Sequence, residues 1–174
     1  MKRIFVGAAL LVLLTSCSLT EPIPIKGQVV SCEEIKLKSG QTPPLECLGG
    51  GAPIAADAIM GPALINVWGT WCAPCKKELP HLAHFLQKGD GSVQVIGIAV
   101  EEKSQAAVKK FIRSNGMTWP VLYDKSGSTR ATFGMGVPVT WFIDETGEVV
   151  HKKYGPFNST EEIQLAVAKY LGKP

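Results

Sequence analysis

Two cysteines, Cys72 and Cys75, lie where a buried strand is expected to give way to a helix. The apolar run at residues 63–68 precedes them and a helix-forming segment follows. Because only two residues separate them in the first helical turn, the thiols are close enough to form a disulfide. Unpaired backbone N–H groups and the positive end of the helix dipole stabilise a thiolate at this place. Thiolates attack disulfides, so the motif indicates thiol–disulfide exchange.

The composition favours one globular domain. Of the 174 residues, 45% are hydrophobic and 19% are charged, which argues against a disordered chain or a fibre. The net charge of +3 includes Lys2 and Arg3, two basic residues in a segment that we expect to be removed. Without them, 16 basic and 15 acidic residues remain, which is a net charge of +1 (16 − 15). This near balance leaves no basic field for nucleic acid.

The N-terminus resembles the signal of a bacterial lipoprotein. A basic pair at positions 2 and 3 precedes an apolar run over residues 4–14, which is too short to span a bilayer comfortably. The tetrapeptide Leu-Thr-Ser-Cys that ends at Cys17 resembles a lipobox, in which the cysteine is diacylated and becomes the new N-terminus. An ordinary cleaved signal with an incidental cysteine is the alternative.

Three parts of the chain follow from this resemblance. We expect residues 1–16 to be a removed signal peptide, residues 17–27 to be a lipid-anchored tether, and residues 28–174 to form the domain. The protein is then expected in the cell envelope, outside the cytoplasm. Ser18 is not the aspartate that resembles an inner-membrane retention signal. This favours the outer membrane of a two-membrane cell, or the outer face of the plasma membrane in a one-membrane cell.

The remaining cysteines form an even set in this disulfide-permissive setting. Without Cys17, four of the five cysteines are left, and Cys72 and Cys75 form the local pair. A bond between Cys32 and Cys47 closes a loop of about 15 residues, worth about 3 kcal/mol in the chain-entropy model. We expect this bond to be structural. A second redox pair that passes electrons to the first is the alternative, although no helix start activates these thiols.

The sequence pattern predicts alternating strands and helices from residue 63 onward, as in an α/β sandwich. Strands are expected at residues 63–68, 93–100, 121–123, 139–143 and 148–154. Four helices are expected. The first follows the cysteine pair and should be kinked by Pro80, and the second follows Ser104. The third covers residues 128–133, and the fourth follows Ser159, which begins a capping-box sequence. Residues 29–48 are expected to form an irregular hairpin, followed by a triple-glycine turn.

The chain from residue 63 to the C-terminus resembles the thioredoxin fold, which is a central mixed β-sheet flanked by helices. Residues 66–80 (NVWGTWCAPCKKELP) are similar to envelope-anchored thioredoxin-like proteins of the TlpA and ResA type, and residues 119–124 and 136–144 agree with this. Two departures are visible. The segment before Pro138 is one residue shorter than is usual, and the Cys32 to Cys47 region lies outside the core fold.

The resemblance implies a role for each site residue. Cys72 is the attacking thiolate and Cys75 the resolving thiol. Pro138 matches a cis-proline that brings the backbone of Val137 beside the thiols to bind a substrate strand, and Trp71 is expected to contribute to the same surface. A trans proline at a strand edge is the alternative. No cofactor is expected beyond the redox-active disulfide itself.

Glu78 is the third expected catalytic residue. Cytoplasmic thioredoxins have a buried aspartate on the central strand where this chain has Asn66, which cannot titrate. In the TlpA and ResA type, a glutamate three residues after the second cysteine lies near the thiols. Such a carboxylate raises the thiol pKa by repulsion and can act as general base for the resolving cysteine. The alternative is a surface residue paired with a lysine such as Lys77.

Other classes fit less well. His81 and His84 follow the cysteines, so a zinc or copper site is one alternative. They begin more than a turn later, however, and lie off the apolar stripe of the helix. We therefore expect no metal. A peroxiredoxin needs a threonine where Gly69 stands. A binding module with an inert disulfide is the remaining alternative, although a bridge this tight at a helix start is usually reducible.

The sequence therefore predicts a thiol-disulfide oxidoreductase that acts on thiols and disulfides of envelope proteins. The resemblance to ResA implies reduction of apocytochrome c before haem attachment, and oxidative disulfide formation in exported proteins is the alternative. A membrane electron donor or acceptor and a lipid-anchored membrane attachment are implied, with no nucleic acid partner. We expect a monomer.

Overall fold

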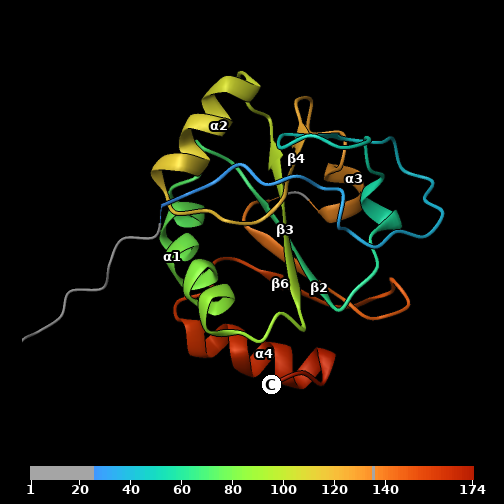
Figure 1. The fold of residues 1–174 in the computed structure, drawn as a ribbon, viewed down its shortest axis with the longest axis vertical. Coiled ribbons are helices and arrows are strands. Elements are labelled where there is room, and N and C mark those ends of the chain that lie inside the picture. Colours follow the sequence, from blue (N-terminus) through green and yellow to red (C-terminus); the bar gives the residue numbers. More distant parts are fainter. Residues whose placement is uncertain (1–25, 135) are drawn as a thin grey trace, which may run out of the picture.

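The computed structural model describes residues 26–134 and 136–174 (Figure 1). The expected signal peptide, the expected lipidation of Cys17 and most of the expected tether lie outside these residues. Within the described part, no helix is both long enough and apolar enough to cross a membrane.

A six-stranded mixed sheet forms the centre of the domain. Its strand order is β1-β4-β3-β2-β5-β6. The strands are β1 (Glu46–Cys47), β2 (Ala63–Trp68), β3 (Gln94–Val100), β4 (Val121–Asp124), β5 (Val139–Ile143) and β6 (Val149–Tyr154). β2 pairs in parallel with β3 and antiparallel with β5. The expected mixed sheet is thus confirmed, with the cysteine motif directly after its central strand.

β2 is buried along its whole length, as its sequence, which is apolar on both faces except at Asn66, predicts. Side chains alternate between the two faces of the sheet, so the strand contributes to two separate clusters of buried apolar residues. Leu64 and Trp68 belong to one cluster, which we call the helix-face core, while Ile65 and Val67 belong to the other, the extension-face core. Asn66 is the one polar residue of β2 and is fully buried.

Three helices cover the helix-face core: α1 (Ala73–Lys88), α2 (Gln105–Ser114) and α4 (Thr160–Leu171). The short α3 (Arg130–Phe133) lies on the other side of the sheet (Figure 1). The predicted caps are confirmed. Ser104 Oγ accepts from the N–H of Ala107 at 3.2 Å, and Ser159 Oγ accepts from the N–H of Glu162 at 3.1 Å. α1 continues through Pro80 to its end at Lys88.

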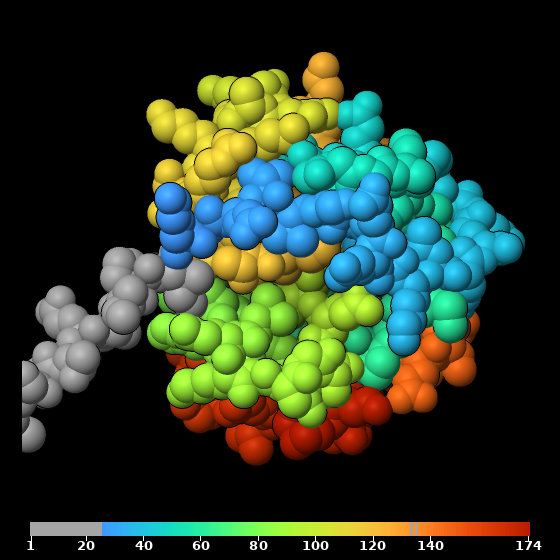
Figure 2. Space-filling view, in the orientation of Figure 1, coloured from blue at the N-terminus to red at the C-terminus, as the bar shows by residue number. Residues whose placement is uncertain are grey.

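The segment that precedes β2 supplies part of the extension-face core. Its buried apolar side chains include Cys32, Ile35, Leu45 and Ile54. Leu45 and Ile54 pair with each other across the triple glycine, through reciprocal backbone hydrogen bonds of 2.8 and 2.9 Å. β1 joins the rest of the domain, because it pairs antiparallel with β4 and forms a sheet edge. Figure 2 shows this segment in blue to cyan, lying across the surface of the domain.

Candidate active site

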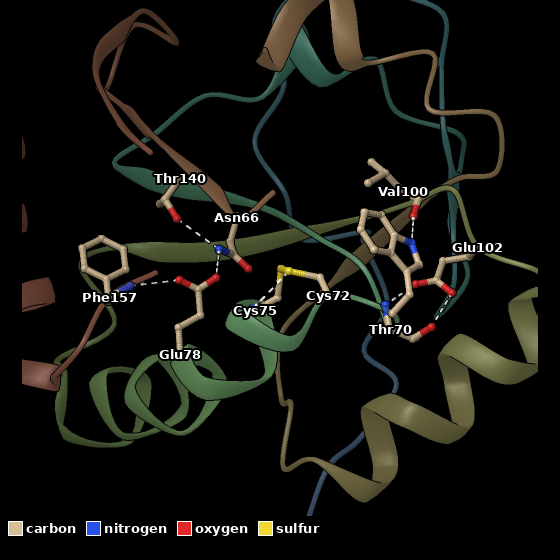
Figure 3. Close-up of a disulfide and its surroundings, with 10 residues drawn as sticks. Asn66, Thr70, Cys72, Cys75, Glu78, Val100, Glu102, Thr140 and Phe157 are labelled. Atoms are coloured by element: carbon tan, nitrogen blue, oxygen red, sulfur yellow. Dashed lines mark hydrogen bonds between the residues drawn. A yellow bond between two sulfur atoms is a disulfide. The ribbon is translucent and has the colours of Figure 1, made fainter. Parts of the chain in front are cut away.

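Cys72 and Cys75 are joined by a disulfide at the first turn of α1 (Figure 3). Cys72 is the N-cap, and its Sγ accepts a hydrogen bond from the N–H of Cys75 at 3.2 Å. Pro74 fits the first turn, where a helix has N–H groups without intrahelical partners. Cys72 is 4% exposed and Cys75 is fully buried, so a substrate reaches Cys72 first.

The turn before Cys72 is fixed by groups at the end of β3. The N–H of Thr70 donates to the Glu102 carboxylate, and the Thr70 hydroxyl donates to it at 2.7 Å. Trp71 Nε1 donates to the carbonyl oxygen of Val100 at 3.3 Å, while half of the Trp71 residue stays exposed at 53%. Glu102 itself is buried. These contacts hold the backbone that carries the attacking cysteine.

Glu102 is not among the site residues predicted from the sequence. The available signal was its position, two residues past the end of a buried strand. Because β2 and β3 are parallel, their carboxyl ends meet at one edge of the sheet, where side chains that follow each strand come together.

The peptide bond between Val137 and Pro138 is cis, as the resemblance implied. Val137 and Trp71 line a pocket of about 210 Å³. The apolar walls come also from Val67 and Val100, which lie at the ends of the two parallel strands. Val137 and Trp71, two of the residues predicted to bind substrate, are thus brought together on one concave surface.

Glu78 lies one turn after Cys75 on α1 and is fully buried, so the alternative of a surface ion pair is wrong. Its Oε1 accepts from Asn66 Nδ2 at 2.8 Å, and its Oε2 accepts from the N–H of Phe157 at 3.1 Å. Asn66 Nδ2 also donates to the hydroxyl of Thr140 at 3.0 Å. These bonds hold a carboxyl group beside the disulfide, inside the protein (Figure 3).

Burial raises the pKa of Glu78 to about 7. The hydrogen bonds from Asn66 and from the N–H of Phe157 oppose this rise, as does the positive charge of Lys153. The carboxylate of Glu162 adds slightly to it. A carboxyl group that titrates near pH 7 can accept and return a proton under ordinary conditions.

The second disulfide joins Cys32 and Cys47 and lies apart from the first. Cys32 is buried in the extension-face core and Cys47 packs against it, whereas Cys72 and Cys75 belong to the helix-face core. The central sheet therefore separates the two pairs. His81 and His84 are half-buried on α1, and the described residues contain no group of three His, Cys, Asp or Glu side chains that could hold a metal ion.

Comparisons with known proteins agree with the fold and the paired cysteines. A family model described as Redoxin matches residues 45–169, which is most of the chain. The chain belongs to the Redoxin family.

Relatives of this Redoxin-family chain include a thiol-disulfide oxidoreductase and a thioredoxin-like protein. Thiol-disulfide oxidoreductase ResA of Bacillus anthracis is 37% identical over 111 residues, which cover 63% of this chain and 61% of ResA. Thioredoxin-like protein YneN of Bacillus subtilis is 30% identical over 139 residues, which cover 77% of this chain and 82% of YneN. The chain thus spans about three fifths of the length of ResA. The predicted resemblance to the ResA type is confirmed.

A solved structure supports the fold of this Redoxin-family chain. StoA from Bacillus subtilis superposes with a TM-score of 0.58 at 27% sequence identity, over 70% of this chain and 92% of StoA. The thioredoxin-like fold predicted from residue 63 onward is confirmed. The site thus has a first cysteine that is slightly exposed, a fully buried second cysteine, a buried titratable carboxyl group and an adjacent pocket. These are the parts that two-step disulfide exchange needs.

Proposed function

We propose that this chain is a thiol-disulfide oxidoreductase whose redox centre is the Cys72–Cys75 pair. The observation that carries the proposal is the disulfide at the start of α1, with Cys72 as the more exposed sulfur. The helix N-terminus favours a thiolate at the N-cap position. The proposal needs no other cofactor, because the dithiol form of this pair holds the two electrons that the exchange transfers.

In the reductive direction, the Cys72 thiolate attacks one sulfur of a substrate disulfide. A mixed disulfide forms and the other substrate sulfur leaves as a thiolate. Cys75 then loses its proton, attacks Cys72 Sγ and displaces the remaining substrate sulfur. Two electrons have passed to the substrate and the Cys72–Cys75 bond is restored. The extended substrate segment binds along Trp71, Val137 and Pro138.

Glu78 is the general base for the second step in this proposal. Cys75 is fully buried and must lose a proton where water does not reach it. The Glu78 carboxyl group is the buried titratable group on the same helix, and its pKa of about 7 suits a proton acceptor. Its negative charge, when present, also disfavours thiolates nearby, which favours the disulfide over the dithiol form.

That electrostatic effect supports reduction of substrates as the physiological direction. Strong oxidants of this fold have stabilised reduced forms, whereas a carboxylate beside the thiols works the other way. Disulfides of envelope proteins are the proposed substrates, and the similarity to ResA suggests a Cys-x-x-Cys-His segment of the kind that attaches haem. Oxidative disulfide formation in exported proteins remains the second candidate, favoured by the disulfide-permissive setting that Cys17 and the Cys32–Cys47 bond suggest.

The proposed location is the cell envelope, with Cys17 carrying a lipid. In that setting a reductive enzyme draws electrons from a membrane donor, and the domain acts as a monomer. Partition into detergent phase tests the anchor: the native chain is expected there, and the Cys17→Ser variant in the aqueous phase. A Cys17→Ser variant that still enters the detergent phase rules the lipid anchor out.

The deciding experiment uses a synthetic peptide with an oxidised Cys-x-x-Cys-His segment. The reduced protein is mixed with it, and transfer of the disulfide is followed by acid quench and mass spectrometry. Rapid reduction is expected, with no reaction in Cys72→Ser. If the reduced protein leaves the peptide oxidised while its disulfide form readily oxidises the reduced peptide, the oxidative function replaces the proposed one. Failure in both directions excludes an exchange enzyme for this peptide class.

A further inference from the structure

Asn66 has one buried polar atom that the oxidised structure leaves without a hydrogen-bond partner. Its side chain is fully buried in the middle of β2. Nδ2 makes two hydrogen bonds, to Glu78 Oε1 at 2.8 Å and to Thr140 Oγ1 at 3.0 Å. Oδ1 makes none in the described part of the chain. An unsatisfied buried acceptor is costly and needs an explanation.

The orientation of this amide follows from its neighbours. Nδ2 faces a carboxylate oxygen and a hydroxyl oxygen, so turning the amide over places Oδ1 against a carboxylate and loses a donor. Figure 3 shows Oδ1 of Asn66 pointing toward the disulfide, while Nδ2 points toward Glu78 and Thr140. The free acceptor is therefore on the side of the redox pair.

In the described part of the chain, two further buried side-chain atoms without partners, Nε1 of Trp68 and Nε1 of Trp119, are hydrogen-bond donors. They cannot receive a hydrogen from a thiol. Asn66 Oδ1 is an acceptor that points toward the disulfide (Figure 3), and reduction of the disulfide creates a new buried donor there, because the fully buried Cys75 gains an S–H group. A partner that is missing in the oxidised state is thus supplied by reduction.

We propose that Asn66 is a positioning residue for the resolving cysteine: in the reduced protein, Asn66 Oδ1 accepts the S–H hydrogen of Cys75. The same side chain then holds the thiol through its oxygen and the Glu78 carboxylate through its nitrogen. Asn66 occupies the place of the buried aspartate of cytoplasmic thioredoxins, and this geometry gives the amide a role that needs no titration. The inference rests on the proposed function only in that Cys75 alternates between thiol and disulfide.

The bond fits the electron and proton balance of the resolving step. Cys75 starts as a thiol held at Asn66, its proton passes to the Glu78 carboxylate, and the sulfur attacks Cys72 Sγ in the mixed disulfide. The Cys72–Cys75 bond forms, the Cys72–substrate bond breaks, and the substrate leaves as a thiolate. Asn66 loses its partner as the product disulfide forms, which is the state that the structure describes.

Infrared spectroscopy of the S–H stretch tests the bond directly, because hydrogen bonding lowers the frequency of this band and strengthens it. The full chain carrying Cys17→Ala and Cys72→Ala leaves Cys75 as the one free thiol while Cys32 and Cys47 stay bonded. A low-frequency, intense band is expected. Asn66→Leu, which has a similar shape and no acceptor, is expected to move the band to the frequency of a free thiol.

Two control variants in the same background test whether the shift of the S–H band depends on the acceptor at position 66. Thr140→Val removes a partner of Asn66 Nδ2 and leaves Oδ1 intact, so the band is expected not to move. Asn66→Asp keeps an acceptor at the same place, so a low-frequency band is expected in this variant too. An S–H band at the free-thiol frequency in the Asn66 parent, or the same low frequency after Asn66→Leu, overturns the proposal.

A redox equilibrium gives a second readout in the chain with both active-site cysteines. The bond exists only in the reduced form, so Asn66→Leu is expected to shift the equilibrium with glutathione about fivefold toward the disulfide, the size of one typical hydrogen bond. A shift toward the dithiol contradicts the proposal. Neither measurement depends on turnover of a substrate. The bond can therefore be found in a protein that lacks the proposed activity, and the activity can be found without the bond.

Discussion

Glu78 accepts a hydrogen bond from Asn66 across the space between α1 and β2, with 2.8 Å between Oε1 and Nδ2. The two residues stand 12 positions apart in sequence and are both fully buried. This contact links the helix that carries the disulfide to the central strand of the sheet. It also places a titratable carboxyl group in the core, so both stability and chemistry are expected to depend on pH.

The stability of the domain is expected to fall as pH rises from about 4.5 to about 7. The pKa of Glu78 is raised from 4.5 to about 7 in the folded protein. The protonated form is therefore favoured by folding, and this advantage is complete below pH 4.5 and lost as pH rises through 7. A shift of this size corresponds to about 3 kcal/mol. Urea unfolding of wild type and Glu78→Gln across this range measures the difference.

The glutamine side chain of that variant does not titrate, so the difference between the two unfolding curves isolates the contribution of Glu78. Other carboxyl groups, including Glu162, act equally in both proteins. A constant difference across the whole range, from below the ordinary pKa of a glutamate to above pH 7, is the outcome that contradicts a raised pKa for Glu78.

Resolution of a mixed disulfide is expected to slow about 100-fold in Glu78→Gln at about pH 8, which is the lower range for loss of a general base. The glutamine keeps the shape and the hydrogen bond with Asn66 but cannot accept the proton of Cys75. The measurement starts from Cys72 loaded with a chromophoric thiol, whose release is followed by stopped-flow absorbance.

Lys77→Gln is the matched control for this rate. Lys77 is the exposed neighbour of Glu78 on α1, so this change is expected to leave the release rate within about twofold. Equal rates for wild type and Glu78→Gln show that the proton leaves by another route.

Glu102→Ala is expected to destabilise the domain by about 3 kcal/mol. The change leaves the N–H and the hydroxyl of Thr70 without their carboxylate acceptor, and hydrogen bonds to a charged group are among the stronger ones. The loss is measured by urea unfolding at about pH 7. Glu148→Ala removes an exposed ion pair with Lys38 and is expected to cost less than about 1 kcal/mol.

The reactivity of Cys72 distinguishes a positioning role of Glu102 from a role in stability alone. If Glu102 positions the backbone before Cys72, alkylation of the Cys72 thiolate by iodoacetamide is expected to change its rate and its pH midpoint in Glu102→Ala, under conditions where the variant remains folded. An unchanged alkylation profile limits Glu102 to a structural role.

The parts of the fold with local signals could be predicted from sequence. The sequence of β2, which is apolar except at Asn66, predicts a buried central strand, and the serines at positions 104 and 159 predict the helix starts. Strand burial and N-caps both depend on adjacent residues. The cis bond at Pro138 and the place of Glu78 followed from the family resemblance, since neither leaves a signal in periodicity.

Contacts between distant segments could not be predicted in the same way. Glu102 meets Thr70 only because β2 and β3 run parallel, and the free oxygen of Asn66 depends on how β2 faces α1. The edge strand β1 is two residues long and pairs with β4 far along the chain, as at Glu46 and Tyr123. Two residues carry too little periodicity to identify a strand, so the sequence suggested only an irregular hairpin.

The Cys32–Cys47 disulfide is expected to stabilise the domain without taking part in exchange. Cys32 is buried in the extension-face core, on the opposite side of the sheet from Cys75, so no sulfur of this pair has a path to the redox centre through the core. The double variant Cys32→Ser/Cys47→Ser removes a 15-residue link and is expected to lose about 3 kcal/mol of unfolding free energy.

The peptide-reduction assay then decides between a structural bond and an electron relay. At a temperature where the double variant is fully folded, its rate of reducing the Cys-x-x-Cys-His peptide is expected to equal that of the wild type within about twofold. A relay predicts the opposite pattern, in which the first turnover is unchanged and later turnovers stop because electrons no longer reach Cys72 and Cys75. Serial turnover driven by a chemical reductant, compared between the wild type and the double variant, distinguishes these cases.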